Sequence, residues 1–183
     1  YRYWPELSSD CRLMTKLLRD LTDYSMSDQL TKQRSDLCNL LRRAYLSCLP
    51  LTEGTNKTLT YTSRVSCAYM PLDSPKMMEA LLNLIVNALD AVSDNGSVQI
   101  ILTKSNEQFV VSIIDDGCGI APKQLLTIFH PFTTTKPDGT GLGLPVAKRI
   151  IEGHGGHIRV SSAPNQGATF TFLLPCSFSS DKK

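Results

Sequence analysis

The sequence lacks the features that would assign it to several large classes of protein. No apolar run approaches the ~20 residues that a membrane-spanning helix needs, and no signal-peptide pattern opens the chain. The net charge of +2 leaves no excess of basic side chains of the kind that marks a nucleic-acid-binding domain. We therefore expect a cytoplasmic chain that contacts neither nucleic acid nor membrane. Since it has no initiator methionine, we also expect a piece of a longer protein, whose other parts could be membrane-anchored.

The cysteines lack the spacing of a metal site or a redox motif. They form no C-x-x-C pair and lie at Cys11, Cys38, Cys48, Cys67, Cys118 and Cys176. We expect them to be the scattered reduced thiols of a cytoplasmic protein. The motif G-x-x-x-x-G-K-[ST] is also absent, so a nucleotide site in this chain would not be a P-loop.

The length and composition of the chain predict one domain with an appendage. The 183 residues are 42% hydrophobic and 20% charged, which is enough to bury a core. Residues 5–25 carry one apolar helical stripe, and a polar stretch separates them from a second helical pattern whose N-cap is Ser35 or Asp36. A separable first helix suits a hairpin or a dimer stalk, and packing against the main domain is the alternative.

The rest of the chain alternates between strand and helix patterns. The stretch "LTYTSRVSCAYM" from residue 59 is β-like, and a long helix is expected over 75–92. The segments "SVQIILTK" and "FVVSIID" flank a polar turn as paired strands, and "HIRVSSAPNQGATFTFLLP" predicts a second hairpin. This order predicts an α+β fold with helices on one face of a mixed sheet.

The long helix carries two asparagines in its middle. At about 100° per residue, an apolar face that includes Met78 lies opposite a polar face that includes Asn83, Asn87 and Asp90. Most polar faces of this kind are simply solvated. Asparagine is a poor helix former because its amide competes for the backbone, so two of them one turn apart also suit a function.

A strand-end carboxylate is followed by two glycines. The strand "FVVSIID" ends at Asp115 and Asp116, and Gly117 and Gly119 come next. A Rossmann turn is one alternative, but Pro122 stands where its third glycine should be, and no acidic strand end follows at the required distance. A strand-end carboxylate can accept a hydrogen bond from an adenine amino group, and a plain tight turn is the other interpretation.

The segment "TTTKPDGTGLGLPVAKRIIEGHGG" (133–156) places glycines directly before a helix. Glycine lets a ligand approach the backbone, and the unpaired N–H groups of a helix start attract an anion such as phosphate. Lys136 is placed to reach a terminal phosphate. Phe129 and Phe132 are expected to pin the base of this loop to the core.

These segments together carry a family resemblance. In order and spacing, "NLIVNALDA", "DDGCGI", "IFHPFTTTK", "GTGLGL" and "GATFTF" resemble the N, first-glycine, F, second-glycine and third-glycine boxes of sensor histidine kinases. These kinases belong to the GHKL superfamily, with gyrase, MutL-type repair proteins and heat-shock chaperones. The match runs from about Ser74 to Pro175, and its lid segment most resembles the nitrogen-regulation (NtrB-like) type.

The resemblance implies a Bergerat fold, an α/β sandwich that binds ATP with Mg²⁺. By position, Asn87 would coordinate Mg²⁺, Asp115 would accept the adenine amino hydrogen, and Asn83 and Lys136 would join Asn87 in catalysis. Residues 139–144 would form a hinged lid, and Thr169 would back the adenine site. The other ATP-binding positions that it implies are Asp90, Gly117, Gly119, Ile120, Thr135, Gly139, Thr140, Gly141, Leu142, Gly143, Leu144 and Thr169.

The residue four positions before the expected magnesium ligand separates kinases from hydrolases. The members of the superfamily that hydrolyse ATP share a glutamate at this position, which serves as the base for the attacking water. This chain has Asn83, whose amide cannot take a proton at neutral pH. The resemblance therefore implies phosphoryl transfer to a histidine, with a GHKL-type ATPase or a degenerate nucleotide-binding scaffold as alternatives.

The phosphoacceptor histidine is expected outside this chain. None of its three histidines lies in the S-H-E-x-[RK]-[NT]-P context of the family's acceptor helix, the H-box. Residues 1–28 resemble the second dimerisation helix, 29–178 the catalytic domain, and 179–183 a flexible tail. The expected partners are the H-box helix of the same parent kinase, in a homodimer, and a response-regulator receiver domain.

Overall fold

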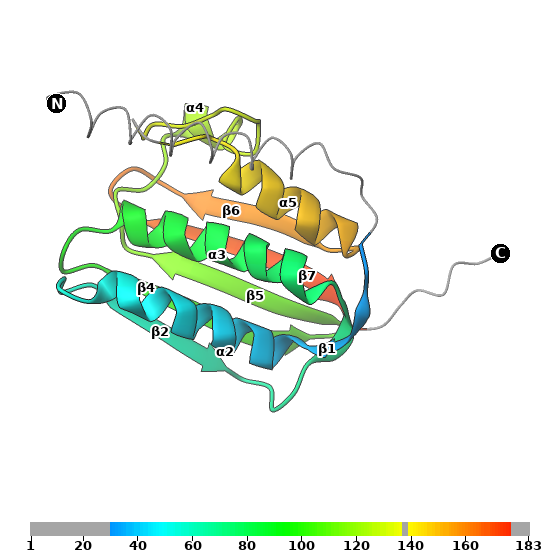
Figure 1. Ribbon diagram of the computed structural model, residues 1–183. Coiled ribbons are helices and arrows are strands. Elements are labelled where there is room, and N and C mark those ends of the chain that lie inside the picture. Colours follow the sequence, from blue (N-terminus) through cyan, green and yellow to red (C-terminus); the bar gives the residue numbers. More distant parts are fainter. Residues whose placement is uncertain (1–29, 137–138, 177–183) are drawn as a thin grey trace, which may run out of the picture.

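A computed structural model describes residues 30–136 and 139–176 of the chain. The helix expected over 5–25, the appendage 1–28 and the tail 179–183 lie outside the described residues. In the part that is described, a sheet forms one layer and helices form the other (Figure 1). None of the helices described there combines the length and the hydropathy that crossing a membrane requires.

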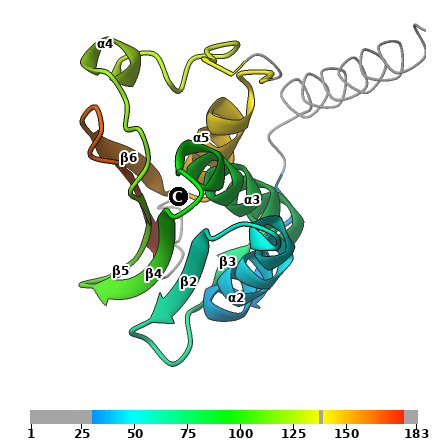
Figure 2. The ribbon, with the colours of Figure 1, turned by 90° about the vertical axis from the view of Figure 1, so that its left-hand side faces the viewer.

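The elements follow one another from a short strand to a C-terminal hairpin. In chain order they are β1 (Gln33–Asp36), α2 (Leu37–Cys48), a 3₁₀ turn (Leu49–Thr52), β2 (Thr58–Ser63), β3 (Tyr69–Leu72), α3 (Ser74–Ala91), β4 (Ser97–Ser105), β5 (Gln108–Asp115), α4 (Pro122–Leu125), α5 (Gly143–Gly153), β6 (His157–Ser162) and β7 (Ala168–Pro175). Figure 2 shows α2, α3 and α5 together on one face of the sheet, whose other face carries no helix of the described chain.

The five-stranded sheet has the order β2-β4-β5-β7-β6 and is mixed. β2 pairs with β4 in parallel, and the other neighbours are antiparallel. Both expected hairpins are confirmed, with Asn106 and Asn165 at positive φ in their turns. Alternate side chains of β5 and β7 are buried under the helices. The expected α+β fold, with helices on one face of a mixed sheet, is confirmed.

The helices begin where the sequence provides caps. The Asp36 carboxylate accepts the amide hydrogen of Cys38 at 3.0 Å, which confirms one of the two expected N-caps. The wholly buried side chains of α3 are Met77, Ala80, Leu81, Leu84, Ile85 and Ala88. The expected apolar face of α3 is confirmed, with Met78 half-buried against the core. The face also includes the wholly buried Met77, because α3 contacts α2 and α5 as well as the sheet.

The β-like stretch from residue 59 is divided between two sheets. β2 joins the five-stranded sheet, whereas β3 pairs with β1 in a separate two-stranded sheet. Residues 64–68 connect the two strands, and the N–H of Leu37 donates to the carbonyl of Ala68 at 2.9 Å. This small sheet therefore holds the start of α2 beside the β2–β3 connection.

Candidate functional site

Strand β5 ends in a buried carboxylate. Asp115 is 5% exposed, and its Oδ1 accepts the N–H groups of Gly117 at 3.0 Å and Ala168 at 3.1 Å. Burial raises the pKa of Asp115, and the two backbone hydrogen bonds oppose that shift. No described residue donates to Oδ2, so this oxygen is available to a ligand that carries an N–H group.

The two glycines after Asp115 lie where other backbone segments come very close. A Cβ atom at Gly117 would collide with the carbonyl group of Ala91, near the C-terminus of α3. Gly119 has φ +68°, and a Cβ atom there would collide with the carbonyl group of Ala163 in the β6–β7 turn. The loop is therefore fixed between α3 and the β6–β7 hairpin, directly beside the carboxylate.

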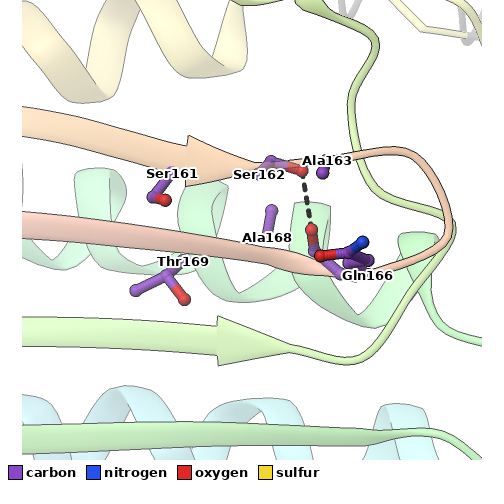
Figure 3. Close-up of a pocket in the computed structure, with 7 residues that line it drawn as sticks. Ser161, Ser162, Ala163, Gln166, Ala168 and Thr169 are labelled. Atoms are coloured by element: carbon purple, nitrogen blue, oxygen red, sulfur yellow. Dashed lines mark hydrogen bonds between the residues drawn. The ribbon is translucent and has the colours of Figure 1, made fainter.

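A serine that the sequence interpretation missed connects this loop to the hairpin. Ser162 Oγ accepts the N–H of Ile120 at 2.9 Å and donates to the carbonyl of Gly167 at 2.6 Å, the bond dashed in Figure 3. A serine near a strand end gives no sequence signal of such a role, because its two partners lie in different segments. Ser162 thus joins the first-glycine and third-glycine segments.

A small polar cavity of about 230 Å³ lies at the same end of the hairpin (Figure 3). It is lined by Ser161, Ser162, Ala163, Gln166, Gly167, Ala168 and Thr169. Small-molecule sites usually occupy about 300–1,000 Å³ and are mostly apolar. We therefore assign it no ligand of its own and regard it as the outer border of the Asp115 loop.

The polar face of α3 is met by a lysine from the loop before α5. Lys136 Nζ donates to Asn87 Oδ1 at 3.2 Å and forms an ion pair with Asp90 Oδ2 at 2.8 Å. One turn earlier, Asn83 faces the first residue of α5: a Cβ atom at Gly143 would lie 3.5 Å from its amide group. The structure thus brings Asn83, Asn87, Asp90 and Lys136 together along one side of α3.

Backbone hydrogen bonds connect the described residues on the two sides of positions 137–138, before α5. The N–H of Phe132 donates to the carbonyl of Gly141 at 3.0 Å, and that of Gly139 to Lys136 at 3.1 Å. Leu142 is wholly buried at the N-cap of α5 and supplies no side-chain cap. The first N–H groups of α5, from Gly143 onward, are left for solvent or an anion. Leu144 and Thr140 lie half-buried on either side of this start.

Two sequence expectations are not met around the site, and a third is left untested. Phe129 packs edge-on against Phe170, with ring centroids 6.4 Å apart, but Phe132 is 62% exposed, so the expectation that it pins the loop to the core is wrong. Thr169 alternates with the buried Ala168, which is the residue opposite Asp115, so its side chain lies on the other face of the sheet. Thr135 is exposed, as is its neighbour Lys136, and its role in ATP binding stays a prediction.

The layered fold and the polar cluster between α3 and the glycine loop define a class of protein, the GHKL-type ATP-binding domains. Residues 72–177 match the family described as "Histidine kinase-, DNA gyrase B-, and HSP90-like ATPase". The chain belongs to this family.

Curated relatives carry names of sensor kinases. Sensor histidine kinase ZraS of Salmonella typhimurium is 32% identical over 170 residues, which are 92% of this chain and 37% of ZraS. Signal transduction histidine-protein kinase AtoS of Escherichia coli is 36% identical over 165 residues, 88% of this chain and 27% of AtoS. The chain thus spans about a third of the length of these relatives.

Solved structures share the fold. The catalytic domain of histidine kinase ThkA is 29% identical with a TM-score of 0.73, over 80% of this chain and 96% of that domain. Full-length ShkA in complex with AMPPNP is 25% identical with a TM-score of 0.80, over 88% of this chain and 35% of ShkA.

Proposed function

We propose that this chain is the catalytic ATP-binding part of a two-component sensor histidine kinase. It would transfer the γ-phosphoryl group of ATP to a histidine on an H-box helix of its parent protein, for relay to an aspartate of a response regulator. The observation that carries the proposal is the contact of α3 with Lys136 and with the start of α5. Asn83 faces the start of α5, and Asn87, one turn further on, bonds Lys136.

Adenine recognition is assigned to Asp115. Its Oδ1 is occupied by two backbone N–H groups, so the carboxylate is fixed in orientation and Oδ2 can accept the hydrogen of an exocyclic amino group. Guanine carries a carbonyl oxygen at that position, and two acceptors would face each other. The AMPPNP complex of ShkA supports an adenine nucleotide as the ligand.

The phosphates are assigned to the lid side of α3. Lys136 supplies a positive charge, the N-terminus of α5 supplies backbone donors, and Asn87 offers one neutral oxygen. A single amide ligand fits Mg²⁺ that is bound with nucleotide, since this ion keeps several waters and relies on phosphate oxygens. When bound, Mg²⁺ would neutralise charge on the transferring phosphoryl group.

Transfer to a histidine is favoured over hydrolysis because Asn83 cannot act as a base for water. We expect Asn83→Glu to raise the rate of phosphate release from ATP, measured against the unchanged chain. Rapid phosphate release by the unchanged chain would instead support the ATPase alternative, and failure to bind any nucleotide would support the scaffold alternative.

The acceptor is proposed to lie outside the chain. Among its histidines, His154 is buried, and both of its ring nitrogens form hydrogen bonds. His130 and His157 lie outside the cluster of Asn83, Asn87, Asp90 and Lys136.

We propose further that residues 1–28 are part of a dimerisation segment and that residues 29–178 are the catalytic domain. The lid sequence favours the nitrogen-regulation (NtrB-like) type, and we propose a homodimeric parent.

The test uses γ-labelled ATP with and without the H-box helix hairpin of the parent protein. The chain alone should acquire no acid-labile phosphate, whereas the added hairpin should be labelled slowly. Transfer is slow because the lost tether had supplied an effective concentration of about the millimolar range. Acid-labile label on the isolated chain that persists after substitution of all three of its histidines would overturn the proposed acceptor. No label on the hairpin under any condition would overturn the kinase assignment.

A further inference from the structure

Cys38 and Cys67, which are far apart in the sequence, lie near each other beside the small sheet that β1 and β3 form. Leu37 and Ala68 are opposite each other, joined by the hydrogen bond of 2.9 Å. Cys38 follows Leu37 in the first turn of α2, and Cys67 precedes Ala68 in the connection 64–68, so the two cysteines flank this hydrogen-bonded pair.

A shared hydrogen-bond acceptor keeps the two cysteines close. Asp36 Oδ1 accepts the N–H of Cys38 at 3.0 Å and the N–H of Ala68, the neighbour of Cys67, at 2.9 Å. With standard bond lengths, these two bonds limit the separation of the cysteine Cα atoms to less than about 10 Å. Disulfides usually span Cα separations of about 4.4–6.8 Å. A disulfide therefore requires the connection 64–68, which is neither helix nor strand, to bring Cys67 within this range of Cys38.

The side chain of Cys38 is directed toward the connection that carries Cys67. Its thiol donates to the carbonyl of Val65 at 3.7 Å and lies 3.7 Å from Ser63 Oγ. Burial raises the pKa of the Cys38 thiol, and the nearby negative charges of Asp36 and of ionised Cys67 raise it further, against the hydrogen bond from Ser63. Cys67 itself is exposed to solvent. The Cys67 thiol is thus more accessible to solvent than the Cys38 thiol, and the two lie close enough for a charge on Cys67 to raise the pKa of Cys38.

We propose that Cys38 and Cys67 form a redox-sensitive pair, which a hydroperoxide converts into an intrachain disulfide. The exposed Cys67 thiolate attacks the peroxide, whose O–O bond breaks, and the sulfur is oxidised to a sulfenic acid while one water is released. The Cys38 sulfur then attacks Cys67 Sγ, the S–O bond breaks, and a second water leaves with the thiol proton. One H₂O₂ accepts two electrons, so two thiols and one peroxide give one disulfide and two waters.

The other described cysteines are placed differently. Cys48 is buried at the C-terminal end of α2, Cys118 follows β5, and Cys176 follows β7. Figure 1 shows the start of α2 beside β1, at the end of the domain away from the arrowhead of β5. Asp115 is the last residue of β5. The disulfide should therefore leave nucleotide affinity within about twofold. It should raise the melting temperature by several degrees, because it closes a loop in the unfolded chain.

The experiment uses the full 183-residue chain carrying Cys11→Ser, Cys118→Ser and Cys176→Ser, which retains the pair and the buried Cys48. After treatment with hydrogen peroxide and alkylation, tryptic peptides 35–42 and 65–76 each contain one cysteine of the pair. We expect them to appear by mass spectrometry as one linked species, two hydrogens lighter than their sum. Dithiothreitol should separate it into the two peptides.

The controls distinguish specific disulfide formation between Cys38 and Cys67 from general oxidation of the cysteines. Cys67→Ser in the same background should abolish the linked species and leave Cys38 a free thiol, because its thiol is shielded. The same two peptides can be followed in the unsubstituted chain, so the result does not depend on the folding of the variant. Cys67 oxidised to sulfinic acid beside a free Cys38, or linkage mainly through Cys48 or between chains, would overturn the proposal.

Discussion

The ammonium group of Lys136, in the loop before α5, forms an ion pair of 2.8 Å with the carboxylate of Asp90 on α3. The two side chains are 42% and 52% exposed, so solvent screens the pair, and its contribution to folding stability is at most about 1 kcal/mol. Its main consequence is positional, because it holds the lysine beside Asn87.

Substitutions at this ion pair should separate stability from catalysis. We expect Lys136→Ala to abolish phosphoryl transfer to the H-box histidine, because the charge compensation at the γ-phosphate is lost. Its free energy of unfolding, measured by urea denaturation, should fall by less than about 1 kcal/mol, as should that of Asp90→Asn. Lys104→Ala, at an exposed lysine of β4, is the matched control and should transfer normally. Normal transfer by Lys136→Ala would remove this lysine from the site.

The strand-end carboxylate should decide nucleotide specificity. Asp115→Asn places an amide donor opposite the adenine amino group and should lose most ATP affinity by calorimetry. The unchanged chain should prefer ATP over GTP by up to about 10⁴-fold, because the wrong base leaves buried polar groups unpaired.

The neighbouring aspartate supplies a control for that experiment. Asp116 bonds the N–H and hydroxyl groups of Ser97 at 2.8 and 2.7 Å, and these bonds lower its pKa. Asp116→Asn should therefore leave ATP affinity nearly unchanged. Equal affinity of the unchanged chain for GTP and ATP would contradict the role of Asp115.

Magnesium should bind tightly only together with nucleotide. Asn87 offers one neutral oxygen, and Mg²⁺ needs phosphate oxygens to complete its coordination. Calorimetric titration of Mg²⁺ into the chain alone should give only a weak heat of binding. The same titration in the presence of ATP should give a clear, saturable heat of binding. Asn87→Asp should impair transfer, since it adds a negative charge near the phosphates. Tight Mg²⁺ binding without nucleotide would contradict this assignment.

Stability should fall when the pH is lowered, because of one buried histidine. His154 is 4% exposed, its Nε2 accepts the N–H of Asp73 at 2.9 Å, and its Nδ1 donates to Ile150 at 2.7 Å. Burial lowers its pKa and the charge of Lys32 adds to this, whereas the Ile150 hydrogen bond and the Asp73 carboxylate oppose it. The unfolded chain thus binds more protons than the folded one once the pH falls below about 6.5, and stability decreases there.

The measurement compares two histidine variants between pH 5 and 7.5. His154→Gln removes the titration and should flatten the pH dependence of urea unfolding by up to about 1.4 kcal/mol per pH unit. His157→Gln, at an exposed position of β6, should keep the slope of the unchanged chain. Since Asp115 is present in all three proteins, its own titration cancels. Equal slopes in both variants would exclude His154 as the cause.

The sequence by itself determined the local elements and the residue types of the site. Alternating apolar residues predicted both hairpins, and Asp36 predicted the start of α2, because strand periodicity and capping depend on neighbours within a few positions. The ordered boxes from residue 83 to residue 172 identified the family for the same reason. Each box is a short contiguous segment whose residues can be recognised before any packing is known.

Only the tertiary structure decided which distant residues meet. The division of β2 and β3 between two sheets, and the complete burial of Met77 beside the half-buried Met78, follow from which neighbours pack against each element. The placement of Ser162 and Thr169 depends on strand register, where one step exchanges the two faces of a sheet. The approach of Cys38 to Cys67 depends on the hydrogen bonds that Asp36 accepts from both segments. The contact of Lys136 with Asn87 spans 49 positions, and no local pattern encodes it, because the packing of the whole layer sets the distance between them.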